Sequence, residues 1–272
     1  MQPVVALRRA LTSNDIAYEM NRRGLDARLV QLHQQVDSTN RVALDLADAH
    51  VIPWTTVVAI EQTDGRGRLD RDWTSPPGRG LLMSVVLDPS QVKTPEQLSL
   101  APLTIGLAVA ATCRELSVPA TVKWPNDVVI DAPELTMGFR KLAGILLERR
   151  AGVPVAGIGL NLSNSATERP VEHATSLLLE RPELADEVSA AAVLASVIAN
   201  VIDRCAKNPV EIAAEYRELC STIGQRVRIV RPDGEDIVGL ADDIDDDGHL
   251  LVETVGGLLT ITSGDVVTLR PA

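Results

Sequence analysis

The chain has 272 residues, of which 45% are apolar and 23% charged, and its formal net charge is −11. This composition excludes a disordered chain, a collagen-like repeat and a disulfide-stabilised scaffold. The acidic balance disfavours nucleic-acid binding through overall charge. Three widely spaced cysteines predict reduced thiols and a cytoplasmic protein. The longest apolar stretch, residues 101–113, is shorter than the ~20 residues that cross a bilayer, so no membrane association is expected.

The hydrophobic pattern up to residue 221 predicts an α+β main domain. A weakly amphipathic helix is expected over residues 5–20. The β-branched and apolar runs that follow predict strands at 31–36, 55–60, 81–87, 122–124, 128–130, 142–147 and 155–160. Longer periodic segments predict helices at 41–49, 98–116, 184–205 and 210–220.

After residue 221 the pattern changes to short strands separated by Asp/Gly turns. These strands are expected at 226–230, 237–241, 250–253, 258–262 and 266–269. Short strands in such close succession predict a small β-barrel. We therefore expect a main domain of residues 1–221 and a small C-terminal domain of residues 222–272.

An arginine-rich loop, residues 62–73, follows the strand predicted at 55–60. Glycines let backbone N–H groups approach a ligand closely, and a guanidinium offers a permanent charge and a forked set of donors to phosphate or carboxylate. Arg66, Arg68 and Arg71 therefore predict a loop that closes over a nucleotide phosphate or a mixed anhydride. The alternative is a surface loop whose arginines pair with Asp64, Asp70 and Asp72.

The stretch Lys123-Trp124-Pro125-Asn126-Asp127 presents an amide and a carboxylate after a short strand. Together they suit a nucleotide, or Mg²⁺ held through water. An Asn-Asp turn that merely joins two strands explains the stretch equally well.

The stretch Asp37-Ser38-Thr39-Asn40 precedes a predicted helix. Ser, Thr and Asn are common N-cap residues, and this structural role is favoured. The alternative is that hydroxyls and exposed N–H groups at the helix start bind a small polar head group.

The strands at 142–147 and 155–160 predict a hairpin. With Glu148 opposite Pro154, one face of the hairpin would carry Lys141, Ala143, Gly157, Gly159 and Asn161. Such a face has little bulk, which favours a flat ligand lying on the sheet. Close packing by a helix or another strand would explain it equally well.

Other features argue against metal or covalent chemistry. Residues 243–248 resemble the start of a calcium loop, but its twelfth position is Thr254 rather than Glu, so a solvated hairpin turn is favoured. The four histidines lack ligand spacing, and no metal site within the protein is predicted. No nucleophile–base pair is apparent, so nothing supports an acyl-enzyme intermediate.

Taken together, the motifs resemble those of the bacterial biotin protein ligases. In chain order they are Ser38-Thr39-Asn40, Glu61-Gln62-Thr63, Gly65-Arg66-Gly67-Arg68, Trp73-Thr74-Ser75-Pro76, Lys123-Trp124-Pro125-Asn126-Asp127, Lys141-Leu142-Ala143-Gly144-Ile145-Leu146, Gly157-Ile158-Gly159-Leu160-Asn161 and Ala174-Thr175-Ser176-Leu177. Each motif is weak alone, whereas their order and spacing are specific. The resemblance implies a mixed sheet flanked by helices, as in class II synthetase-like biotin–lipoate ligase domains, with a C-terminal SH3-like β-barrel.

The resemblance also implies a two-step reaction. Biotin and MgATP form biotinyl-5′-AMP and pyrophosphate, and a lysine of a biotin carboxyl carrier domain, as in acetyl-CoA carboxylase, then attacks the adenylate. The implied catalytic residues are Lys141, Arg68 and Arg66. The implied biotin-binding residues are Ser38, Thr39, Asn40, Gln62, Arg66, Gly67, Arg68, Lys141, Gly157 and Gly159. The implied ATP-binding residues are Arg66, Arg68, Arg71, Trp73, Asn126, Asp127, Lys141 and Asn161.

The chain departs from the family pattern at Asp70, where the loop usually has a third glycine. Some members carry an N-terminal DNA-binding domain, but the stretch before Gln31 is short, so we expect a ligase without operator binding, and formation of a homodimer stays open. Two alternatives stay open. One is a lipoate or octanoate protein ligase, which shares the fold, and the other is a non-catalytic sensor of biotin or its adenylate.

Overall fold

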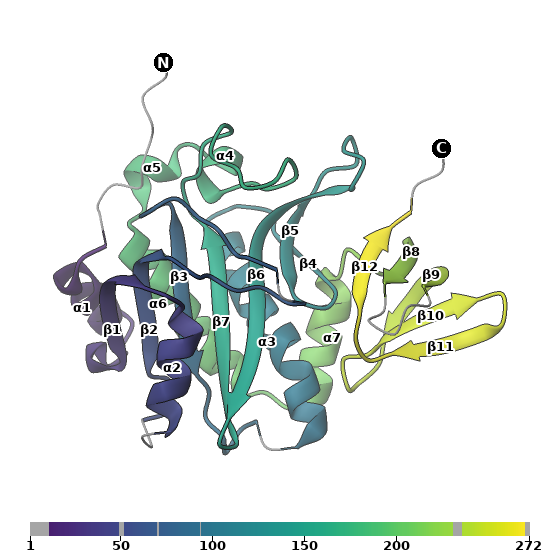
Figure 1. Ribbon diagram of the computed structural model, residues 1–272, viewed down its shortest axis with the longest axis horizontal. Coiled ribbons are helices and arrows are strands. Elements are labelled where there is room, and N and C mark those ends of the chain that lie inside the picture. Colours follow the sequence, from purple (N-terminus) through teal and green to yellow (C-terminus); the bar gives the residue numbers. More distant parts are fainter. Residues whose placement is uncertain (1–10, 49–51, 70, 93, 231–235, 270–272) are drawn as a thin grey trace.

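The computed structural model describes residues 11–48, 52–69, 71–92, 94–230 and 236–269, which form two β-sheets and the helices around them (Figure 1). The strands of the larger sheet are β1 (Val30–Val36), β2 (Thr56–Gln62), β3 (Gly80–Val86), β4 (Thr121–Lys123), β5 (Asp127–Asp131), β6 (Phe139–Arg150) and β7 (Val153–Asn161). They are ordered β1-β2-β3-β7-β6-β5-β4. β1 and β2 run parallel and the other neighbours antiparallel, which confirms the expected mixed sheet.

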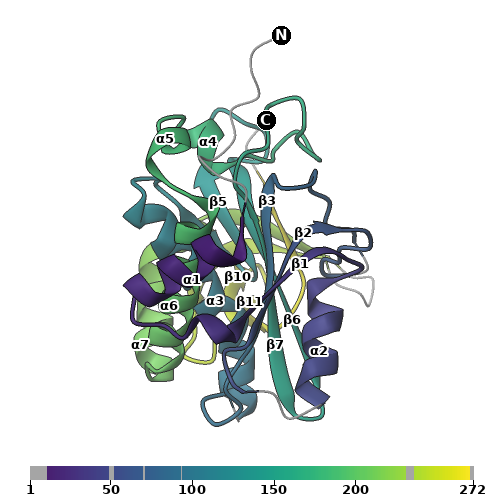
Figure 2. The ribbon, with the colours of Figure 1, turned by 90° about the vertical axis from the view of Figure 1, so that its left-hand side faces the viewer.

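Helices cover both faces of this sheet (Figure 2). One side carries α1 (Ser13–Arg22), α3 (Pro95–Glu115), α6 (Ala190–Cys205) and α7 (Pro209–Leu219), whereas α2 (Thr39–Asp48) packs on the other. α2 covers a small apolar cluster that includes Ala43, Val57 and Val155. Because both faces are buried, the central strands are almost continuously apolar, which made them recognisable in the sequence.

α3 is the longest helix in the described part of the chain. It begins with a capping box, in which Thr94 and Gln97 bond to each other's backbone N–H groups, and Pro95 follows the cap. By length and composition α3 would be able to cross a membrane, but 67% of its apolar window is buried inside the protein. This burial identifies α3 as the core helix of the fold.

The predicted helix at 184–205 is wrong in one respect, because it is two helices. α5 (Leu184–Glu187) ends before Val188, and α6 begins after Ser189, whose side chain accepts a hydrogen bond from the Ala192 backbone N–H. Ser189 is thus an N-cap inside the segment, a signal the sequence contained. A further short helix, α4 (Leu177–Glu180), had not been expected. The first expected helix is present as α1, although its residues 5–10 lie outside the described residues, as does residue 49 at the end of the second.

The hairpin of β6 and β7 differs from the predicted register by one residue. Its turn consists of Ala151 and Gly152, both with positive φ, which is the two-residue turn typical of tight hairpins. This turn pairs Arg149, rather than Glu148, with Pro154. A one-residue shift exchanges the two faces of a strand. Ala143 therefore pairs with Leu160 in the core, and the glycine-bearing face carries Gly144 opposite Gly159 and Leu146 opposite Gly157.

The five strands predicted after residue 221 are all present. They are β8 (Arg226–Val230), β9 (Ile237–Ile244), β10 (Leu250–Thr254), β11 (Gly257–Ile261) and β12 (Asp265–Thr268), and neighbours run antiparallel in the order β11-β10-β9-β8-β12. In the part of the chain that the structure describes, β11 and β12 are the two ends of this sheet, so its hydrogen bonds do not close the expected barrel. Ile229, Ala241 and Val252 are fully buried in its core.

The smaller sheet docks onto the larger one through two residues of the Lys-Trp-Pro-Asn-Asp stretch. Trp124 Nε1 donates to the Gly248 carbonyl at 2.9 Å, and Lys123 Nζ donates to the Val266 carbonyl at 2.8 Å. Burial lowers the pKa of the Lys123 ammonium. The Lys123 contact brings β12 next to β4, and the Trp124 contact brings the β9–β10 turn to the end of β4, so part of the C-terminal sheet lies beside the polar stretches of the larger sheet.

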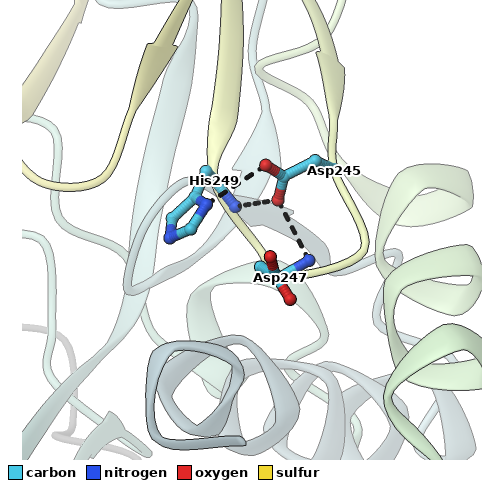
Figure 3. A group of neighbouring side chains, drawn as sticks. All are labelled: Asp245, Asp247 and His249. Atoms are coloured by element: carbon cyan, nitrogen blue, oxygen red, sulfur yellow. Dashed lines mark hydrogen bonds and ion pairs between the residues drawn. The ribbon is translucent and has the colours of Figure 1, made fainter. Parts of the chain in front are cut away.

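The acidic turn between β9 and β10 is a hairpin turn, as predicted (Figure 3). Asp245 Oδ1 accepts hydrogen bonds from the backbone N–H groups of Asp247 (3.0 Å) and His249 (2.8 Å), and Asp245 Oδ2 lies 3.1 Å from His249 Nδ1. The Asp245 carboxylate is therefore engaged within the turn, and its structural role accounts for the acidic sequence.

Candidate active site

A cavity of about 350 Å³ opens where the start of α2, the arginine-rich loop, β6, β7 and β12 meet. Nearly every site residue expected from the sequence lines this cavity: Ser38, Thr39, Asn40, Gln62, Arg66, Gly67, Arg68, Arg71, Trp73, Asn126, Asp127, Lys141, Gly157 and Gly159. Asn161 lies outside the lining, at the end of β7 and opposite Gly80. Segments more than a hundred residues apart thus form one site.

One end of the cavity has a hydrogen-bonded polar floor. Gln62 Oε1 accepts from the Thr39 backbone N–H at 2.7 Å and from the Thr39 hydroxyl at 2.9 Å. The Ser84 hydroxyl lies 2.6 Å from Asn40 Oδ1 and 2.8 Å from Thr39 Oγ1. The side chains of Thr39 and Asn40 therefore bond to neighbouring strands rather than to the first turn of α2. The favoured N-cap role is wrong for these two residues, and the head-group alternative fits their placement.

Glu148 connects this floor to the arginine-rich loop, a role the sequence did not indicate. Its Oε2 accepts from Asn40 Nδ2 at 2.7 Å, and its Oε1 accepts from Arg66 Nη2 at 2.9 Å. Gly157 leaves the space that Asn40 occupies, because a Cβ there would overlap the Asn40 amide. Arg66 and Asn40 are thus held by one carboxylate on β6.

The Trp73 indole lies on the glycine-bearing face of the β6–β7 hairpin. A Cβ at Gly159 would overlap this ring, and one at Gly144 would lie 2.9 Å from Trp73 Cζ3. Lys141 Nζ lies 5.5 Å from the centroid of the indole, within the range of a cation–π contact. The flat group that the glycines accommodate in this structure is therefore a tryptophan side chain, and it forms one wall of the cavity beside Lys141.

The loop arginines reach across the cavity instead of pairing with the acids of their own loop. Arg68 Nη1 donates to Asn126 Oδ1 at 3.0 Å, and Arg71 pairs with Asp265 on β12. Asp64 pairs with Arg41 outside the loop, whereas Asp70 lies outside the described residues. The alternative of a locally paired surface loop is wrong for the described arginines.

Lys141 is the cation at the centre of the lining. Its Nζ lies 2.7 Å from Asp127 Oδ1, and its backbone N–H donates to the His173 carbonyl at 2.6 Å. Arg68 approaches the same region through Asn126, the neighbour of Asp127. Cations that converge next to a neutral polar floor suit a ligand with a polar head and a negatively charged end, and they suit a second anion beside it.

The fold and this site define a ligase of the biotin and lipoate type. Residues 32–164 match the biotin/lipoate A/B protein ligase family, and residues 222–268 match the biotin protein ligase C-terminal domain. The biotin–[acetyl-CoA-carboxylase] ligase of Mycobacterium tuberculosis is 36% identical over 97% of this chain and 98% of its own length. The bifunctional ligase/repressor BirA of Escherichia coli is 29% identical over 91% of this chain and 76% of its own length.

A solved structure leads to the same family. The biotin protein ligase of Aquifex aeolicus in complex with biotin and ATP superimposes with a TM-score of 0.73 and 28% identity, over 89% of this chain and 99% of that protein. The chain belongs to the biotin protein ligase family. The resemblance recognised from the order of the sequence motifs is thereby confirmed.

Proposed function

We propose that this protein is an ATP-dependent ligase that activates biotin as biotinyl-5′-AMP and transfers the biotinyl group to a lysine of the carrier domain of acetyl-CoA carboxylase. The observation that carries the proposal is the convergence of Lys141 and Arg68 between the polar floor and the Asn126–Asp127 pair. The relatives of similar length and the structural neighbour are ligases of this activity by name.

Biotin would bind with its polar ureido ring on the floor formed by Ser38, Thr39 and Gln62. Ser38 and Thr39 are almost completely buried, at 2% and 4% exposure, so their hydroxyls face a site that excludes bulk water. Asn40 and Gly157 shape the same end of the cavity, whereas Gly159 lies against the Trp73 ring. A polar group in a site that excludes water discriminates strongly against ligands that leave it without a hydrogen-bond partner.

Lys141 would lie between the biotin carboxylate and the α-phosphate of ATP. As the carboxylate attacks phosphorus, negative charge builds on the phosphate oxygens, and a fixed ammonium stabilises that charge more than the charge of the ground state. Arg66, Gly67, Arg68 and Arg71 would close over the two anions and hold them in line.

Asn126 and Asp127 would serve ATP, with Trp73 on its adenine side, whereas Asn161, which the resemblance also implies, lies outside the cavity lining. The amide oxygen of Asn126 and the carboxylate of Asp127 line the cavity, and such oxygen donors fit a Mg²⁺ ion that accompanies the phosphates and shields their charge. Asp127 already contacts Lys141, so the two residues would orient each other beside the phosphates.

We further propose that residues 1–221 form the catalytic domain and residues 222–272 a separate C-terminal domain that contributes Asp265 to the site. Support comes from the hydrogen bonds that join Trp124 and Lys123 to the smaller sheet. Cys113, Cys205 and Cys220 are free thiols, in keeping with a reduced cytoplasmic compartment.

The direct test is to mix the purified protein with biotin, MgATP and a carboxyl carrier domain and to measure the mass of the carrier. We expect a gain of one biotinyl group, absent when the acceptor lysine is replaced by arginine. Parallel reactions with lipoate and octanoate separate the related ligases. Modification by either acid but not by biotin would refute the proposal, and binding of biotin without modification would indicate a sensor.

Replacing Glu148 by glutamine is expected to raise the KM for biotin about 10-fold with a smaller effect on kcat. A glutamine has no charge and only one acceptor oxygen, so it weakens the contact with the Arg66 guanidinium, and a hydrogen bond to a charged group contributes about 1.5–3 kcal/mol. The measurement is biotin-dependent pyrophosphate–ATP exchange at varied biotin concentration.

Glu215→Gln provides a matched control for this variant. Glu215 is also paired with an arginine, Arg204, but it lies on α7 outside the cavity lining. If Glu148→Gln lowers kcat and leaves the KM for biotin unchanged, the inferred link between the floor and the loop is wrong.

A further inference from the structure

His173 lies beside the reacting end of the cavity. Its carbonyl accepts the Lys141 backbone N–H at 2.6 Å, and the next residue, Ala174, forms a parallel bridge with Lys141. Its imidazole packs edge-to-face against Phe139, with ring centroids 5.7 Å apart and an angle of 76°. Both rings line the cavity, and His173 is half-buried. The fold thus holds this imidazole next to the backbone of the central cation.

Each acidic residue that lines the cavity is either paired with a cation or exposed to solvent, which distinguishes these residues from His173. Asp127 is paired with Lys141, and Asp265 is paired with Arg71. Asp72 is exposed on the loop. Within the described ranges, neither ring nitrogen of His173 has a hydrogen-bond partner. It is therefore a half-buried base of the lining that is free to bond to a ligand.

Burial and two neighbouring cations favour the neutral form of the His173 imidazole. Burial is the main cause that lowers its pKa, and the positive charge of Lys141 on β6 lowers it further. Lys123 on β4 acts in the same direction, whereas Asp127 on β5 and the adjacent Glu172 act against it. The net shift is downward from the ordinary value near 6.5, so the neutral form with an available lone pair predominates at pH 7.

The second step of the reaction needs such a group. The acceptor lysine arrives as an ammonium, and with a pKa near 10.4 roughly one lysine in 2,500 is unprotonated at pH 7. A positioned base removes the proton at the reacting site, which accelerates a transfer step by about 10²–10⁴-fold.

We propose that His173 is the general base for the transfer step, an inference that rests on the proposed function. The acceptor ammonium gives one proton to the unprotonated ring nitrogen of His173. The resulting lysine amine then attacks the carbonyl carbon of biotinyl-5′-AMP. The C–N bond forms, the bond from that carbon to the phosphate oxygen breaks, and AMP leaves with the bonding electron pair. The amide nitrogen loses its second proton to solvent.

The test separates the two half-reactions. For His173→Gln, the ratio of the single-turnover transfer rate to the pyrophosphate–ATP exchange rate is expected to fall about 10²-fold. The transfer rate of the wild-type enzyme should rise with pH through the pKa of an imidazole below 6.5, and this inflection should disappear in the variant. Imidazole added to His173→Ala should restore part of the transfer rate. His33→Gln, on β1 and outside the lining, is the matched control.

Two results would overturn the inference. One is an unchanged ratio of the two rates, including equal losses in exchange and transfer, which indicate a structural role, and the other is an unchanged pH profile. A wild-type enzyme that forms no adenylate at all would refute the proposed function itself. Because exchange does not involve the acceptor, these two failures are distinguishable.

Discussion

Replacing Lys141 by alanine is expected to lower biotin-dependent pyrophosphate–ATP exchange roughly 10³-fold, because the variant loses the ammonium placed to stabilise charge on the α-phosphate. It also leaves Asp127 without the cation 2.7 Å away, which adds an unbalanced negative charge where two anions must meet. Both effects act on the first step. The measurement is the exchange rate at saturating biotin and ATP, together with binding of biotin alone.

Lys207→Ala is the control for this variant. The Lys207 ammonium is also paired with a carboxylate, at 2.9 Å from Glu215, but it lies outside the cavity lining. We expect its exchange rate to stay within about twofold of the wild type. A Lys141→Ala enzyme that exchanges at a wild-type rate would remove Lys141 from the reaction centre.

Replacing Arg68 by alanine is expected to speed dissociation of biotinyl-5′-AMP by roughly 10²–10³-fold. The Arg68 guanidinium is mostly buried, and truncating one member of a buried charged contact costs about 2–5 kcal/mol, most of it in the dissociation rate. The loop would also lose its hydrogen bond to Asn126 and so close less firmly over the adenylate. The measurement is the release of labelled adenylate after rapid dilution.

Arg28→Ala is the matched control, because Arg28 forms an ion pair with Asp26 on the surface, where such pairs contribute little. If the adenylate leaves Arg68→Ala no faster than it leaves this control, the loop does not retain the intermediate. Faster release with unchanged adenylate synthesis would instead separate retention from chemistry and leave Lys141 as the main group of the first step.

The elements predicted from the sequence were recovered where local signals were strong. The apolar strands of the larger sheet, the long helix that became α3 and the five short strands after residue 221 are present, with shifts at their ends. Errors arose where one residue decides the outcome. Ser189 divides a predicted helix, and the turn at Ala151 and Gly152 shifts a hairpin by one register position.

The residues of the candidate site also divide into those that local sequence signals predict and those that they do not. Most of the cavity lining belongs to stretches with an unusual local composition, such as glycine next to arginine, and such stretches are recognisable from the sequence. The groups that were missed are ordinary residues in ordinary segments. Glu148 lies near the end of β6, after an apolar run, and Asp265 is the first residue of β12. Glu148 and Arg66 are 82 residues apart, so no local pattern indicated their contact.

The sequence by itself determined the class of fold, the chemistry of the site and the family, because these depend on runs of residues and on the order of motifs. Tertiary structure alone decided which acid each cation meets, which face of the hairpin carries the glycines, and that His173 lies beside Lys141. The physical reason is that these contacts depend on strand register and on the packing of distant segments, which form only when the whole chain has folded.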